Sequence, residues 1–131
     1  MKPILTVDAN VITRLFLNDH PELSLKARKI FDSASNGKIQ IYIDEVIIAE
    51  ISWVLRSVYK YDKITITTLL EKLMSPQWII NPRKKLILKT LSRYKKYKLS
   101  YIDSWIWTIS ENARLSFVTF DKTLNKLSKS T

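Results

Sequence analysis

Cysteine is absent from the sequence, and glycine and histidine each occur only once. Without cysteine, the chain cannot form a disulfide, use a thiolate nucleophile or hold zinc through sulfur. The single glycine, Gly37, excludes the glycine-rich loops of nucleotide-binding folds, because those loops need several glycines to bring backbone close to phosphate. The single histidine, His20, lies in the loop-like stretch NDHPE, which is a poor setting for a catalytic triad or a histidine-rich metal site.

Long apolar runs are also absent. No stretch approaches the roughly 20 apolar residues of a membrane span. The start, MKPILTVDAN, reaches an acid at Asp8 too early for a signal peptide. We therefore expect no membrane segment and a cytoplasmic location. With 131 residues, of which 46% are hydrophobic, the sequence predicts a single domain spanning residues 1–131.

Acidic residues are scarce relative to basic ones. The chain has 12 aspartates and glutamates against 22 lysines and arginines, for a net charge of +10. A small domain with this charge attracts polyanions over long distances. Nucleic acid is the expected partner, with a membrane surface or simple solubility as the alternatives.

What is present is an alternation of strand-like and helix-like segments. Asp44 is expected to cap one of the helices and Asn81 another, with Pro82 at the first helical position of the latter. The alternation predicts a three-layer α/β domain with a mainly parallel sheet flanked by helices. The expected strands are 3–7, 38–43, 78–80 and 116–120, and the expected helices are 10–17, 20–37, 45–59, 61–76 (with an ambiguous β-branched start), 82–98, 100–115 and 122–130.

Three aspartates occupy positions where local structure and chemistry are both plausible reasons for an acid. Asp8 and Asp121 each follow an apolar strand and precede a helix, so both are expected at the carboxyl edge of the sheet, where open α/β sheets build their sites. Capping of the following helix is the local alternative. Asp103 enters a largely apolar helix, and a capping box with Ser100 is its local alternative.

Glu50 interrupts the apolar helical stretch EVIIAEISWVL (45–55). Its neighbours on the same helix face include Val46, Trp53 and Val54. The sequence therefore predicts that Glu50 points toward the core, where an unpaired carboxylate costs several kcal/mol. A buried ion pair is the structural alternative, although no basic partner lies on that face.

Together the four acids suggest one pocket. Carboxylates that converge repel each other, so either some stay protonated or a divalent cation binds. Oxygen ligands without histidine or cysteine suit hard ions such as Mg²⁺ or Mn²⁺. A basic surface beside such a site is appropriate for hydrolysis of phosphodiester bonds.

The ordered stretches around these acids resemble PIN-domain ribonucleases, and most closely the VapC-type toxins of toxin–antitoxin pairs. The resemblance spans nearly the whole chain. The four matching stretches are TVDANVITRLFL (6–17), EVIIAEISWVL (45–55), SYIDSWIWTI (100–109) and FVTFDKTL (117–124).

The resemblance implies a four- or five-stranded sheet with the first strand central, and a metal-dependent endoribonuclease. It implies that one or two Mg²⁺ or Mn²⁺ ions are bound by Asp8, Glu50, Asp103 and Asp121, which would orient a water for attack on RNA. Asn10 and Thr119 match polar positions beside the family's site. The resemblance also implies a homodimer and a cognate antitoxin whose C-terminal segment blocks the toxin's groove.

Two features depart from the family pattern. Trp105 and Trp107 stand where small residues usually follow the third acid, so either the helix packs differently or the rings add to a dimer or antitoxin surface. No apolar run after Asp121 is available for the final strand that many members carry, so the edge of the sheet is expected to be truncated.

A basic ridge is predicted on the helix after Pro82. Lys85, Lys89, Arg93 and Lys96 follow at near-helical spacing. The apolar stripe of the same helix is expected to consist of Ile87, Leu91 and Tyr94. Such a ridge could bind RNA phosphates without sequence preference, or it could be a solvated face.

Three other kinds of protein are alternatives to the nuclease. A catalytically degenerate domain that binds RNA or protein is the main alternative. An aspartyl-phosphate phosphatase fits less well, because Asn10 stands where its second aspartate is needed. A phosphoacceptor receiver needs an acid pair after its first strand, and Asp8 stands alone.

Overall fold

Three short parallel strands form one sheet in the computed structural model, which describes residues 1–129. Leu5 of the first strand is in register with Ile41 of the second, which in turn faces Ile79 of the third. Ile41 and Ile79 are fully buried, as expected for β-branched residues in a covered parallel sheet. The strands, in sheet order, are β1 (Ile4–Thr6), β2 (Gln40–Tyr42) and β3 (Ile79–Ile80).

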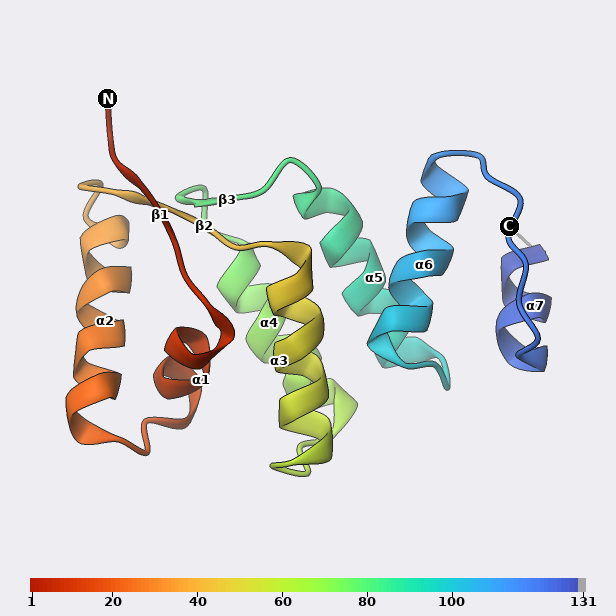
Figure 1. Cartoon of the computed structure of the whole chain (residues 1–131), viewed down its shortest axis with the longest axis horizontal. Coiled ribbons are helices and arrows are strands. Elements are labelled where there is room, and N and C mark those ends of the chain that lie inside the picture. The colour runs from red at the N-terminus through yellow and green to blue at the C-terminus, as the bar shows by residue number, and fades with distance from the viewer. Residues whose placement is uncertain (130–131) are drawn as a thin grey trace.

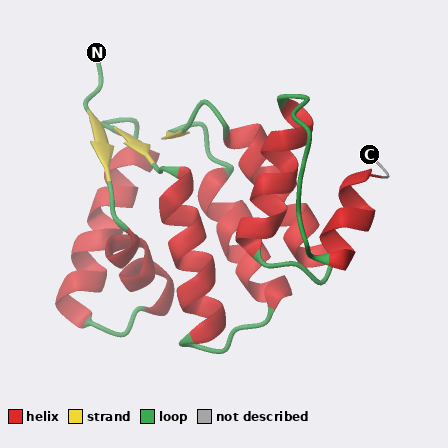
Figure 2. Ribbon diagram, turned by 45° about the vertical axis from the view of Figure 1, so that its right-hand side comes forward, coloured by secondary structure: helices red, strands yellow, loops and turns green. Residues whose placement is uncertain are grey.

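Helices connect the strands and continue beyond them, which gives the predicted α/β arrangement. The sheet lies toward one end of the molecule's long axis and the C-terminal helix lies at the other (Figure 1). Coloured by type, the fold is dominated by helix (Figure 2). The helices are α1 (Ala9–Leu17), α2 (Pro21–Ser35), α3 (Glu45–Ser57), α4 (Lys63–Met74), α5 (Lys84–Lys96), α6 (Tyr101–Asn112) and α7 (Lys122–Lys129).

Side-chain caps set several helix starts. Asp44 accepts a hydrogen bond from the Val46 amide at 3.0 Å and begins α3, which confirms the predicted cap. Asp62 accepts from the Thr65 amide at 2.7 Å and begins α4 at Lys63. The β-branched residues that made this region ambiguous are therefore helical, because the cap and the burial of Ile66 outweigh their weak helix propensity.

The predicted start of α5 is wrong by two residues. Asn81 does not cap a helix at Pro82; its side-chain oxygen accepts from the Arg83 amide at 2.7 Å, within a turn. The Asn81 amide nitrogen donates to the Ile43 carbonyl at 2.8 Å and to Glu45 at 2.6 Å. These tertiary bonds hold Asn81 against α3, so the helix begins only at Lys84.

One main core unites the sheet with helices α1–α6, and a smaller cluster joins α6 to α7. The predicted apolar stripe of α5 is confirmed, since its three members are buried in the main core. The main core includes Ile12, Ile41, Ile48, Ile51, Leu55, Leu70, Ile79, Ile87, Leu91 and Tyr94, and the smaller cluster is built on Leu99, Trp107 and Leu124.

The sheet differs from the expectation in size and order. A four- or five-stranded sheet is not confirmed, because three strands form within residues 1–129. β1 lies at the edge of the sheet and not at its centre. The stretch 116–120, predicted as a strand, has no strand assignment, because it runs beside α6 and α7 without a backbone partner. Between Asp121 and Lys129 the chain forms α7 and no further strand.

No helix within residues 1–129 combines the length and apolar character needed to cross a bilayer.

Candidate active site

Asp8 directly follows β1 and caps α1. Its Oδ1 accepts a hydrogen bond from the Val11 amide at 3.1 Å, and its backbone is extended. The local explanation for this aspartate is therefore correct, yet it does not exclude a second role. The side chain is exposed, and its other oxygen has no hydrogen-bond partner within residues 1–129.

Glu50 lies on the exposed face of α3, and the prediction that it points toward the core is wrong. The buried face of this helix is formed by other residues, including Ile48 and Ile51. Val46 and Trp53, on the side of Glu50, are themselves exposed. The apolar neighbours therefore line an uncovered surface, so the carboxylate has no burial cost to offset. Within residues 1–129 it also has no hydrogen bond or ion pair, which leaves it free to bind a ligand.

Asp8 and Glu50 share one cavity. α1 packs against α3, and the contact leaves a hollow of about 440 Å³ between them. Asn10, the residue predicted to assist the acids, lines the same hollow. Arg14 and Tyr59 contribute to its wall. Three of the predicted site residues are thus brought together from two separate elements.

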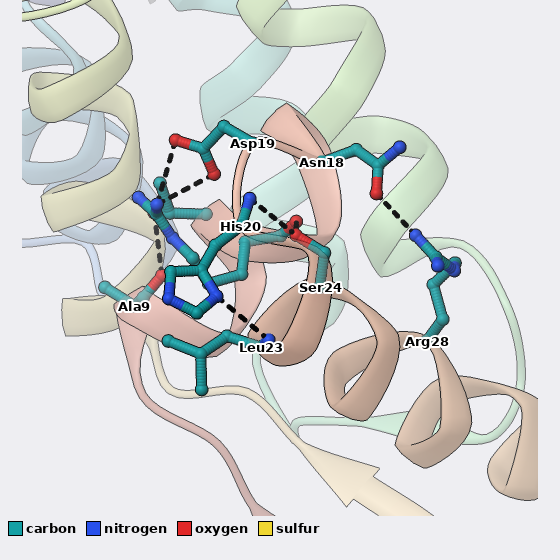
Figure 3. A network of polar contacts seen from close by, with 9 residues as sticks. Ala9, Asn18, Asp19, His20, Leu23, Ser24 and Arg28 are labelled. Carbon is teal, nitrogen blue, oxygen red and sulfur yellow. Dashed lines mark hydrogen bonds and ion pairs between the residues drawn. The ribbon is translucent and has the colours of Figure 1, made fainter.

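Arg14, which was not predicted from the sequence, adds a fixed positive charge to this cavity. Its Nη1 lies 2.7 and 2.9 Å from the two carboxylate oxygens of Asp19. Its Nε is buried and has no hydrogen-bond partner in the described chain. Its position four residues after Asn10, on the same helix face, was the available signal. The surrounding polar network joins the end of α1 to the start of α2 (Figure 3).

His20 belongs to this network as a structural residue. Its Nδ1 accepts a hydrogen bond from the Leu23 amide at 3.2 Å, so the ring caps α2 (Figure 3). Its backbone amide donates to the Ser24 hydroxyl at 3.4 Å.

Asp103 and Asp121 lie outside the cavity of Asp8 and Glu50. The Asp103 amide donates to the Ser100 hydroxyl at 3.0 Å, so the capping interaction exists. Asp121 caps α7 by accepting from the Leu124 amide at 2.7 Å. The Thr119 hydroxyl accepts from the Asp121 amide at 3.1 Å and fixes the turn that holds this acid. In the part of the chain that the structure describes, no three acidic, histidine or cysteine residues form a group able to hold a metal ion.

One known protein family matches the sequence over almost its whole length. The family model for the PIN domain matches residues 5–130. The chain belongs to the PIN domain family. No curated protein and no solved structure matches it significantly. PIN domains are generally nucleases and usually use divalent metals, so membership supports a hydrolase that acts on RNA.

The donors in the cavity of this PIN domain fit a hard divalent ion. Mg²⁺ is usually held by one or two carboxylates and keeps several waters. Asp8 offers one uncommitted oxygen and Glu50 offers a whole carboxylate, and the amide of Asn10 stands beside them. The volume leaves room for water in addition to an ion.

Half of the predicted basic ridge is committed to the fold of the domain. Arg93 Nη2 lies 2.8 and 2.9 Å from the two carboxylate oxygens of Glu111, and Lys89 Nζ lies 2.6 Å from one of them. The Arg93 guanidinium also stacks 3.7 Å from the ring centroid of Trp107. These contacts join α5 to α6. Lys85 and Lys96 are exposed and have no carboxylate partner within residues 1–129.

The two unexpected tryptophans are packed within the chain. Trp107 is buried in the smaller cluster with Leu99 and Leu124. Trp105 is half-buried against the main core, and the Arg83 guanidinium lies 5.9 Å from its ring centroid. α6 thus uses both rings for its own packing, which accounts for the loss of the small residues expected there.

Proposed function

We propose that this PIN domain is a metal-dependent endoribonuclease, a VapC-like toxin that hydrolyses RNA phosphodiester bonds. The observation that carries the proposal is the shared cavity of Asp8 and Glu50, with Asn10 in its wall. The net charge of +10 supports it, because a basic surface attracts the RNA backbone toward an acidic pocket.

The residues of the cavity have distinct parts in this proposal. Capping of α1 holds Asp8 in one orientation, so its second oxygen faces a fixed direction. Glu50 supplies a carboxylate that no other group in the described chain neutralises. Asp103 and Asp121 are the further proposed ligands, and Thr119 positions Asp121. One or two Mg²⁺ or Mn²⁺ ions, when bound, would activate water and stabilise charge on the phosphate.

Arg14 can hold the negative charge of the RNA at this cavity. Its guanidinium is fixed by Asp19, so it approaches a phosphate without losing further side-chain freedom. Lys85 and Lys96 are the members of the ridge left to contact RNA.

We also propose the partners that the VapC resemblance implies, a cognate antitoxin and a second copy of this chain. The exposed apolar face of α3, with Val46 and Trp53, supports a protein contact of this kind.

A catalytically degenerate PIN domain that binds RNA or protein is the second candidate. It is favoured by one observation, the separation of Asp103 and Asp121 from the cavity of Asp8 and Glu50. Metal binding discriminates between the two candidates. A ligand that binds the folded state raises the melting temperature, so Mn²⁺ should stabilise the nuclease.

The test uses Asp8→Asn and Glu50→Gln. Each should reduce metal-dependent RNA cleavage at least about 100-fold, because each removes a charge from the site. In EDTA both variants should unfold within about 0.5 kcal/mol of wild type, since asparagine still caps a helix and Glu50 is an exposed group without a partner. Cleavage of total RNA and thermal unfolding with and without Mn²⁺ provide the measurements.

Asp32→Asn is the matched control. Asp32 is an exposed acid on α2 whose side chain has no partner in the described chain, so its loss should change neither cleavage nor the Mn²⁺ effect. Cleavage that persists in EDTA, together with a fully active Asp8→Asn variant, would reject a metal-dependent nuclease with its site in this cavity.

A further inference from the structure

A strand-like segment near the C-terminus is exposed along most of its apolar side chains. We call residues 115–121 the arm. Val118 is 85% exposed, Phe120 is fully exposed, and Leu115 is also exposed. Val118 and Phe120 are alternate residues of this extended segment, and neighbouring exposed apolar groups of this size mark an interaction site.

The backbone of the arm is unpaired as well. No amide of residues 116–120 donates a hydrogen bond to another group within residues 1–129. One face of the arm is nevertheless anchored, because Phe117 packs against the cluster of Leu99, Trp107 and Leu124. The arm is therefore an extended segment that is covered on one face and open along its backbone edges.

The opposite end of the molecule has an unpaired strand edge. Among residues 1–129, β1 pairs with β2 and with no other strand, so one of its edges is free. Ile4 and Leu5 are exposed although both are apolar. A free apolar edge is a template for another strand, and proteins usually cover such edges. Figure 1 shows β1 and the arm separated along the long axis of the molecule.

We propose that the arm of one copy adds to the free edge of β1 in a second copy, with the reciprocal exchange completing a two-fold dimer. The sheet is parallel throughout, so the arm is expected to add in the parallel sense. One reciprocal exchange would pair the free edge of β1 with the backbone groups of the arm that face it, in both copies. Closed two-fold exchange of identical elements is a low-cost route to a dimer.

The second copy is the favoured occupant because the arm is already held in place. To reach β1 of its own chain, the arm would have to leave the cluster of Leu99, Trp107 and Leu124, or α6 and α7 would have to move with it. A second copy can bring its β1 to the arm while Phe117 stays buried. The exposed residues Val118 and Phe120 then face the partner.

The exchange has a consequence for the site, and this part rests on the proposed function. Asp8 follows β1, and Asp121 ends the arm. Parallel addition places the ends of both strands at one sheet edge. Asp121 of the partner subunit would therefore join Asp8 and Glu50, which a single copy holds without it.

Introduced thiols test the pairing directly, because the chain has no cysteine of its own. Leu5 and Val118 are both exposed, so we expect Leu5→Cys and Val118→Cys to leave the fold unchanged. The two variants are unfolded together, refolded as a mixture and treated with a short bis-maleimide. Exchange predicts a covalent dimer from the mixture. A Leu25→Cys and Val118→Cys mixture is the control and should not be linked, because Leu25 is an exposed residue of α2 and not part of the edge of β1.

The double variant Leu5→Cys/Val118→Cys decides which copy is the partner. Exchange predicts products of dimer mass. A product of monomer mass, linked within one chain, would overturn the proposal, as would the absence of any linkage in both experiments.

Complementation tests the shared site. Asp8→Asn and Asp121→Asn chains, refolded together, form mixed dimers in which one site carries both changes and the other carries none. Since random mixing makes half of the dimers mixed, about one quarter of wild-type cleavage should return. No recovery in a mixture that still cross-links overturns the shared site. If wild type itself cleaves no RNA, the proposed function fails, and the cross-linking result alone decides the exchange.

Discussion

Removal of the Glu111 carboxylate should show how much the ion pairs of Arg93 and Lys89 contribute to the free energy of unfolding. Glu111 binds both Arg93 and Lys89, and the Arg93 side chain is only 11% exposed. In Glu111→Gln one neutral acceptor oxygen remains, so the shape is kept while the charge is lost. The Arg93 guanidinium then remains largely buried beside Trp107 without the Glu111 carboxylate.

The magnitude follows from the exposure of the two pairs. Hydrogen bonds to charged groups contribute about 1.5–3 kcal/mol, and a neutral acceptor about 1 kcal/mol. Lys89 is half exposed, so its pair adds at most about 1 kcal/mol. We therefore expect Glu111→Gln to lower the free energy of unfolding by about 2 kcal/mol. For a domain of this size the melting temperature should fall by roughly 8 °C.

Urea and thermal unfolding at low and high salt are the assays, with Glu22→Gln as the matched control. Glu22 pairs with Lys26 at 3.4 Å on the exposed surface of α2, and its loss should change stability by less than about 0.5 kcal/mol. Equal effects from the two variants would refute the reasoning, because they would show that the burial of Arg93 adds nothing to its ion pair.

Two predictions concern the free part of the ridge and the start of α3. The double variant Lys85→Ala/Lys96→Ala should leave the melting temperature unchanged and weaken RNA binding. The slope of log affinity against log salt should fall by about 0.7 for each RNA phosphate that is no longer neutralised. Equal affinity would show that these lysines are only solvated charges. The Tyr42 hydroxyl, which donates to Asp44 at 2.7 Å, and then the Val46 amide hold the pKa of Asp44 below its ordinary value. The folded state therefore binds fewer protons than the unfolded state, and this stabilisation is present at neutral pH and lost as the pH falls through the lowered pKa. Asp44→Asn keeps the cap but removes the titration, so its deficit in unfolding free energy, about 1 kcal/mol at neutral pH, should vanish in acid; a deficit that is constant with pH would contradict this assignment.

Local signals in the sequence predicted the helices well. Asp44 and Ser100 cap helices where their neighbours require it, because capping depends on residues two or three positions away. Where a distant partner intervened, the prediction failed. Asn81 reads as a helix cap, yet its hydrogen bonds to Ile43 and Glu45 hold it in a turn.

Three of the residues that the sequence proposes for the site line one cavity, and their part in catalysis stays a prediction. Asp8, Asn10 and Glu50 meet in one cavity, as the order of motifs suggested. The orientation of Glu50 was predicted wrongly, because a helix rich in apolar residues on every side does not show which face is buried. Val46 is as apolar as Ile48, but only Ile48 reaches the core.

Pairing between distant residues lies beyond a single sequence. Arg93 and Glu111 are 18 positions apart, and nothing local marks them as partners. The alternation of the arm survives in the structure, with Phe117 half-buried and Val118 exposed, but a strand also needs a neighbour. The sequence pattern of the arm predicts which side chains alternate, but the tertiary fold decides whether another strand lies beside it.

If the arm and the free edge of β1 pair between copies, the number of complete sites depends on the concentration of the chain. A pair that forms by exchange is second order in the chain, so in the dilute range a doubling of chain concentration raises the number of pairs about fourfold. Chains that are scarce would keep Asp8 and Glu50 in an incomplete cavity. The proposed RNA cleavage would then rise more steeply than the concentration of the chain, so a small increase in expression would produce a larger increase in cleavage.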